Sequence, residues 1–76
     1  MKKFFVVRAV NRQDGSASAP AESFDTEKEA RSVFFTRASQ ATISDNLTDC
    51  VLMFTAEGFV VDKVGFNNQP EPETEI

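Results

Sequence analysis

The segment TEKEARSVFFTRASQA, residues Thr26–Ala41, is the stretch of the chain with a sustained helical period. Its small and apolar residues recur at spacings of three and four, which places them on one stripe of a helix: Ala30, Val33, Phe34, Ala38 and Ala41. Thr26 followed by Glu29 is a capping box, with Asp25 as the alternative cap. We therefore expect a helix that ends near Ala41 or Thr42 and packs this stripe against a sheet.

The borders of the helix raise two further expectations. Phe35 lies about 100° around the helix from Phe34, which makes it a candidate exposed aromatic. The alternative is that its ring folds over the edge of the sheet. Ile43 falls on the polar side of the helical wheel, so we expect Ile43 and Leu47 to enter the core from a loop instead.

The strongest strand signal precedes the helix, in the Phe- and Val-rich segment KFFVVRAVN at residues Lys3–Asn11. Both faces of this strand are apolar apart from Arg8. Because Arg8 is costly to bury without a partner, we expect its face to point away from the helix. This assigns Phe5, Val7 and Ala9 to the helix side and Phe4, Val6 and Val10 to the opposite side. It predicts that a charge is tolerated at Val6 and not at Val7.

A first hairpin is predicted around Asp14-Gly15, a dipeptide suited to a two-residue type I′ turn. This turn folds Ala17–Phe24 back along the first strand and pairs Phe5 with Phe24. Pro20 lacks an N–H, and its neighbours are mostly Ala and Ser. The returning segment is therefore either a weak edge strand or an extended loop.

A second hairpin is predicted from Asp49–Thr55 and Phe59–Phe66, which flank Ala56-Glu57-Gly58. Glu57 is a poor residue for positive φ, so we expect a three-residue loop with Gly58 in the left-handed position. This register places one set of apolar residues on one face, namely Leu52, Phe54, Val60 and Val64. It places Val51, Met53, Phe59 and Val61 on the other. A two-residue loop would exchange the faces of the last strand.

Together these elements predict an α+β fold of ββαββ order, with one helix on one face of a small antiparallel four-stranded sheet. If Ala17–Phe24 is irregular, the sheet has three strands and the order is βαββ. We assign residues 1–66 to a single domain and residues 67–76, which hold two Pro and three Glu, to a disordered acidic tail. The order of a strand, an FDTEKEA-type helix start and a closing hairpin resembles many small bacterial and phage proteins and indicates no particular family.

The residue inventory argues against catalysis. The chain has no His, which removes the usual general base and most zinc and copper sites. Cys50 is the single cysteine, and its apolar neighbours indicate a buried structural thiol. Asp45 and Asp49 lack the spacing of a calcium loop, and the isolated glycines cannot form a phosphate-binding loop. We therefore expect no enzyme activity, no catalytic or metal-binding residues, no cofactor and no small-molecule substrate.

The charge pattern bears on partners and location. Formal net charge is −4, and the three Glu of the tail leave only −1 for the body. This balance argues against a general nucleic-acid or membrane-surface binder. A basic edge of Lys2, Lys3, Arg8 and Arg12, with Phe4, is the alternative: weak contact with single-stranded nucleic acid. The acidic tail could instead mimic nucleic acid in an inhibitor. No membrane span or signal peptide is evident, so we expect a cytoplasmic protein.

The sequence favours a non-catalytic protein-interaction module that forms a homodimer or joins a small protein partner. The reason is an excess of apolar residues over what one helix can cover. The candidate interface on the sheet face away from the helix comprises Phe4, Val6, Val10, Val51, Met53, Phe59 and Val61, with Phe35 on the helix as an additional exposed candidate.

Overall fold

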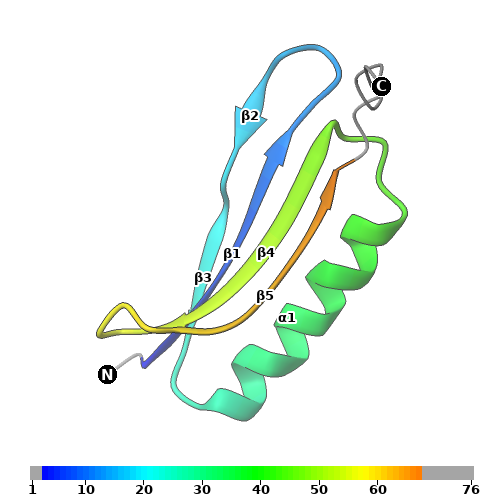
Figure 1. The fold of residues 1–76 in the computed structure, drawn as a ribbon. Helices are drawn as coiled ribbons and strands as arrows, with labels where there is room; N and C mark the ends of the chain where they lie inside the picture. The colour runs from blue at the N-terminus through cyan, green and yellow to red at the C-terminus, as the bar shows by residue number, and fades with distance from the viewer. Residues whose placement is uncertain (1–2, 68–76) are drawn as a thin grey trace, which may run out of the picture.

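The computed structural model describes residues 3–67. Of the predicted tail at 67–76, Asn67 belongs to the last strand, and residues 68–76 lie outside the described range. The elements, in chain order, are β1 (Phe4–Asn11), β2 (Ala17–Ser18), β3 (Ala21–Phe24), α1 (Glu27–Thr42), β4 (Thr48–Thr55) and β5 (Val60–Asn67). All strand pairs are antiparallel, in the order β2-β1-β4-β5, with β3 also paired to β1. The helix covers one face of this sheet, as Figure 1 shows, so the predicted α+β fold is confirmed.

The predicted second strand is present in two pieces. Ala17–Ser18 and Ala21–Phe24 both pair with β1. Between them the Pro20 carbonyl still accepts a hydrogen bond from the Arg8 N–H at 3.1 Å, but Pro20 returns none, which breaks the strand in two. This break follows from the missing N–H of proline. The last strand extends one residue further than predicted and includes Asn67.

The helix start agrees with the prediction. Thr26 is the N-cap, and its Oγ1 accepts a hydrogen bond from the Glu29 N–H at 3.2 Å and donates to Glu29 Oε1 at 3.0 Å. The expectation for Ile43 is wrong, because this side chain is 84% exposed. Ile43 occupies the C-cap, where its N–H donates to the carbonyl of Gln40 and the chain turns away from the sheet.

The core lies between α1 and the sheet. Its buried members come from the helix and from the two central strands: Ala30, Phe34, Ala41, Val6, Val51 and Met53. Half-buried apolar residues surround them, namely Phe4, Phe24, Val33, Ala38, Val64 and Phe66. The predicted helix stripe is therefore the stripe that faces the sheet.

The expected assignment of faces on β1 is wrong. Val6 and Val10 point toward the helix and are 1% and 6% exposed, whereas Phe5 and Val7 lie on the other side. The turn explains part of the error. Arg12 N donates to Ser16 O at 2.8 Å, so the loop has three residues with only Gly15 at positive φ, +91°. The extra loop residue pairs Phe24 with Phe4 in place of Phe5, and a shift of one residue exchanges the faces.

The second hairpin follows its predicted loop and then departs from the predicted register. Thr55 N donates to Phe59 O at 2.9 Å, and Gly58 has a φ of +96°, as a three-residue loop requires. Val60 then pairs with Phe54, but Asp62 pairs with Met53, because a β-bulge intervenes. The bulge brings Val64 opposite Val51 on the helix side.

No helix within residues 3–67 has the length and apolar character needed to cross a membrane.

Candidate interaction surface

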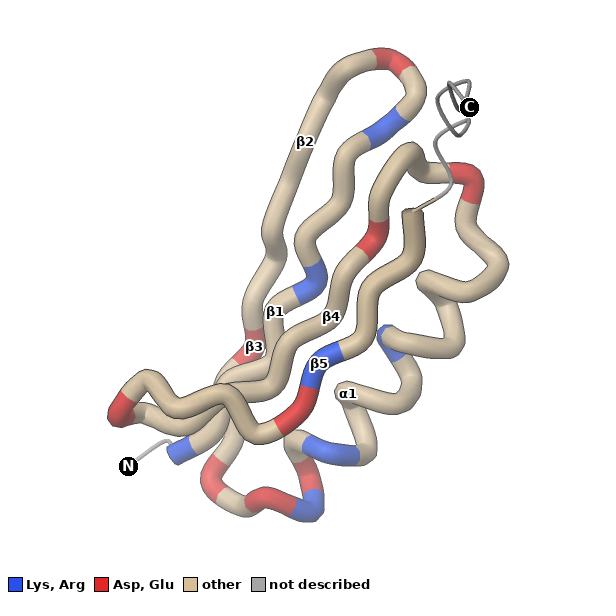
Figure 2. Tube along the Cα trace, in the orientation of Figure 1, with Lys and Arg blue, Asp and Glu red and all other residues tan. Residues whose placement is uncertain are grey.

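The sheet face opposite the helix is apolar over its centre. Three direct cross-strand pairs between β1 and β4 form it, and we name this set the outer face: Phe5–Phe54, Val7–Leu52 and Ala9–Cys50. All of these side chains are half-exposed. They alternate with the buried residues of the same strands and so point away from α1. Few charges lie along β1 and β4 (Figure 2).

The surroundings of the outer face are also poor in charge. On the β3 side, Ser23 pairs with Phe5 and Ala21 with Val7. On the β5 side, Lys63 pairs with Leu52 and Gly65 with Cys50. The rings of Phe5 and Phe54 stack with centroids 5.4 Å apart and an interplanar angle of 20°. The outer face is therefore a flat apolar patch with one cationic neighbour, Lys63, among the described pairs.

The residues predicted from the sequence as an interface divide into two groups. Phe4, Val6, Val10, Val51 and Met53 face the helix and belong to the core or its border, so the predicted placement of these five is wrong. Phe59, Val61 and Phe35 are exposed, at 71%, 37% and 58%. Cys50, predicted to be a buried thiol, lies half-exposed on the outer face.

On the observed faces Arg8 lies on the helix side, where it pairs with Asp49. Arg8 Nε donates to Asp49 Oδ1 at 2.8 Å, and Arg8 Nη2 donates to Asp49 Oδ2 at 2.6 Å. Ser44 and Asn46 also donate to Asp49, which is fully buried. The hydrogen bonds from Arg8 hold the pKa of Asp49 below its usual range, against the opposing effect of burial. Arg8 is thus accommodated under the helix because it is paired.

This pairing also removes the predicted basic edge. β1 lies inside the sheet between β3 and β4, so it has no free edge within the described residues. Arg8 and Phe4 face the helix, while Lys3 and Arg12 lie at opposite ends of the strand. Lys2 is outside the described range. The described cations of this set therefore do not form one continuous surface.

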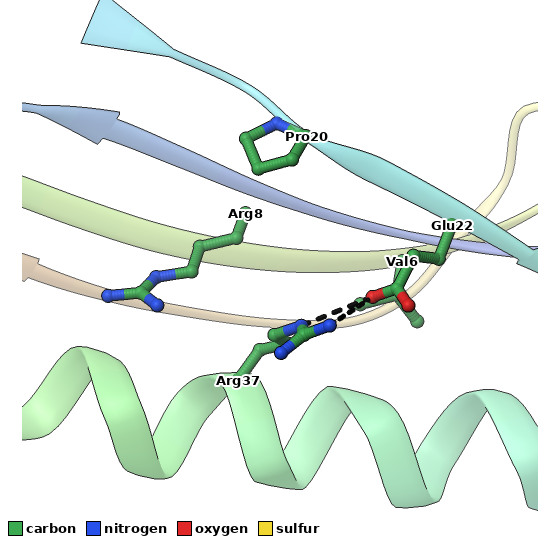
Figure 3. Close-up of a pocket in the computed structure, with 5 residues that line it drawn as sticks. All are labelled: Val6, Arg8, Pro20, Glu22 and Arg37. Atoms are coloured by element: carbon green, nitrogen blue, oxygen red, sulfur yellow. Dashed lines mark hydrogen bonds and ion pairs between the residues drawn. The ribbon is translucent and has the colours of Figure 1, made fainter.

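A pocket of about 190 Å³ lies between α1 and the interrupted edge strand, lined by Val6, Arg8, Pro20, Glu22 and Arg37 (Figure 3). Arg37 Nη2 donates to Glu22 Oε1 at 2.7 Å, and Arg8 is held by Asp49. Both arginines direct Nη1 at Gln40 Oε1. Each guanidinium in the lining thus already has a carboxylate partner, which leaves little to attract an ionic ligand.

Within residues 3–67, no group of three or more His, Cys, Asp or Glu side chains is placed to hold a metal ion. Every buried side-chain N and O atom in the same range has a hydrogen-bond partner. The buried polar groups therefore satisfy one another and point to no missing ligand.

No protein-family model, curated protein or solved structure matches the chain. The geometry of the described residues is therefore the basis for a function, and the outer face is the apolar part of the sheet that α1 does not cover.

The sequence carried a signal for the Arg8–Asp49 pair that composition alone does not reveal. Arg8 is in phase with Val6 and Val10 along β1, and Asp49 is in phase with Val51 and Met53 along β4. Each charged residue thus lies on the same face of its strand as the apolar residues named with it. Opposite charges placed in this way on two apolar strands are typical of an ion pair between neighbouring strands.

Proposed function

We propose that this chain is a non-catalytic protein-interaction module that associates with a second copy of itself through the outer face. The single observation that supports this proposal is the half-exposed apolar cluster on β1 and β4, opposite the face that α1 covers. Burial of this cluster against an identical cluster would remove apolar surface from water in both copies.

The dimensions of the sheet support a modest affinity. Strands lie about 4.8 Å apart and rise about 3.4 Å per residue, so four strands of roughly eight residues span about 500 Å². Two such faces would bury about 1,000 Å² in total, below the range of about 1,200–2,000 Å² for stable specific interfaces and in the range of weak, transient ones. Two sheets packed about 10 Å apart would bring the stacked rings of Phe5 and Phe54 against those of the second copy.

The test is the substitution Val7→Asp, at the centre of the outer face. Val7 is half-exposed, so the variant is expected to remain folded by circular dichroism and to lose self-association by light scattering. Ser39→Asp, on an exposed position of α1, adds the same charge away from the sheet and serves as the control. A wild-type protein that stays monomeric at high micromolar concentration, or a Val7→Asp variant with unchanged mass, contradicts the proposal.

The competing role is weak binding of single-stranded nucleic acid. The engagement of Arg8 by Asp49 and the interior position of β1 weigh against it. Salt-dependent retention on a column of single-stranded DNA tests it directly, since phosphate contacts release counterions and weaken as salt rises. Retention lost in the Lys3→Gln variant would favour this role over self-association.

A further inference from the structure

The two edges of the sheet differ in their protection. On one side, β2 and β3 are short, Pro20 lies between them, and Glu22 is bridged to Arg37 of the helix. On the other side, β5 runs for eight residues without a proline, and no strand within residues 3–67 pairs with its outer edge. The β5 edge carries Lys63 and a bulge near its start, both of which discourage pairing, but the stretch of β5 from Val64 onward has no charge and no proline. This stretch is therefore the part of the edge that is open to a partner strand.

The helix supplies an apolar group beside this open edge. Arg31 pairs with Asp62 of β5 at 3.3 Å, whereas Arg37 pairs with Glu22 of β3 at 2.7 Å. These two contacts fix which side of α1 faces each edge. Phe35, one turn after Arg31, therefore lies on the β5 side, and it is 58% exposed.

The level of Phe35 along the strand follows from the same contact. α1 and β5 run in the same direction (Figure 1). One helical turn rises about 5.4 Å, and two strand residues rise about 6.7 Å. Phe35, four residues after Arg31, therefore lies near the level of Val64, two residues after Asp62. Val64 is half-buried against the core, and the Phe35 ring lies edge-on to that of Phe34, with centroids 5.5 Å apart. Phe35 and Val64 are thus two apolar side chains near the same level of the open edge.

We infer that β5 pairs antiparallel with β5 of a second copy, around a two-fold axis perpendicular to the sheet, with Val64 opposite Val64 and the two Phe35 rings meeting above them. Such an axis places both helices on the same side of one continuous sheet. It also requires each residue of β5 to lie opposite a residue of the same face.

The charges on β5 disfavour two alternative registers. Centring the pair on Asp62 sets two carboxylates opposite each other, and centring it on Lys63 sets two ammonium groups opposite each other. Both arrangements are unfavourable. Centring on Val64 places Lys63 opposite Gly65 and Asp62 opposite Phe66, so no like charges meet. In the Val64 register, the two Phe35 rings also lie at the same position along the paired β5 strands.

This edge interface is distinct from the outer-face interface of the proposed function. The two-fold axis of the edge interface is perpendicular to the sheet, whereas the two-fold axis of the outer-face interface lies parallel to the sheet. Both interfaces acting together give a closed tetramer with two layers of continuous sheet and the helices outside. Either interface alone gives a dimer.

Phe35→Glu tests the edge interface, with Thr36→Glu as the matched control at the next, exposed helix position. Both variants are expected to fold, because both positions are exposed. Phe35→Glu is expected to halve the mass measured by sedimentation, and Thr36→Glu is expected to leave it unchanged. A Phe35→Glu variant with the wild-type mass overturns the inference, whatever Val7→Asp does. A Phe35→Glu effect with no Val7→Asp effect instead removes the outer-face proposal and retains this one.

Hydrogen exchange gives a second measurement that does not depend on a substitution. In the paired state, the β5 backbone N–H groups that point away from β4 donate to the second copy. Their exchange in wild type is expected to slow as protein concentration rises, and to lose this dependence in Phe35→Glu. Outward N–H groups that exchange at one rate at all concentrations overturn the strand pairing.

Discussion

Arg8 and Asp49 form an ion pair on the face of the sheet that the helix covers. They are 41 residues apart in the chain and meet through two hydrogen bonds between β1 and β4. From the sequence, Arg8 had no identifiable partner, so its side chain was expected to face away from the helix. The cost of burying a charge depends on its partner, and a partner this distant is identified only when the strand pairing is known.

Asp49→Asn is predicted to destabilise the fold strongly. The substitution leaves the Arg8 guanidinium beneath the helix without its carboxylate, and breaking a buried pair costs about 3–5 kcal/mol. Urea denaturation followed by circular dichroism measures the loss. Asp45→Asn, an exposed change of the same chemistry nearby, is expected to cost less than about 0.5 kcal/mol. Similar losses in both variants contradict a stabilising role for the pair.

Acid is predicted to destabilise the protein through Asp49. The pKa of Asp49 is lowered in the folded state, first by the hydrogen bonds from Arg8. The folded state therefore favours the carboxylate. Its contribution is complete above the unfolded-state pKa of about 3.9 and is lost as pH falls through the lower folded-state value. The free energy of unfolding should decrease with falling pH in wild type and less steeply in Asp49→Asn. Asp45→Asn, an exposed change in the loop before β4, should keep most of the wild-type dependence.

At the level of elements, the helix was predictable and the register of the strands was less so. The helix start, its stripe and its end depend on local spacing and capping, which the sequence displays directly. Which side chains of a strand face the helix depends on the length of the preceding loop, because one additional loop residue shifts the register and exchanges the two faces. The loop at Gly15 has one residue more than predicted, while the bulge after Val60 shifts a hairpin whose loop was predicted correctly.

The corrected faces predict opposite outcomes for neighbouring valines. Val6→Asp places a charge in the core, where Val6 is 1% exposed, and should unfold the chain. Val7→Asp changes the half-exposed outer face and should leave a folded protein. Circular dichroism and thermal denaturation of the two variants measure this difference. A folded Val6→Asp and an unfolded Val7→Asp would mean that the helix covers the other face.

At the scale of the whole molecule, the sequence predicted a sheet with more apolar surface than one helix covers. It did not identify the residues of the uncovered face, because both faces of β1 and β4 are apolar. Which set becomes the core depends on the positions of Arg8, Asp49 and the bulge, and these act through contacts between distant segments. The outer face therefore consists of the β1 and β4 residues that alternate with those predicted from the sequence.

Cys50 provides a native probe of the outer face. It is half-exposed and lies opposite Gly65, which has no side chain to cover the thiol. If the outer face is buried between two copies, alkylation of Cys50 by iodoacetamide should slow as protein concentration rises. In Val7→Asp the rate should not depend on concentration. A concentration-independent rate in wild type contradicts burial of the thiol by self-association.

The break at Pro20 determines whether strand pairing can continue without limit. A sheet with two open edges can add copies indefinitely and grow into a fibre, whereas one open edge is used up by a single two-fold contact. Pro20 lies between Ser18 and Ala21, and it returns no hydrogen bond to β1 although its carbonyl accepts one from Arg8 N–H, so the edge strand is divided in two. Pro20→Val should permit a continuous second edge strand and promote fibrillation, measured by thioflavin T fluorescence. Pro20 would then be the residue that prevents further copies from adding to the second edge of the sheet.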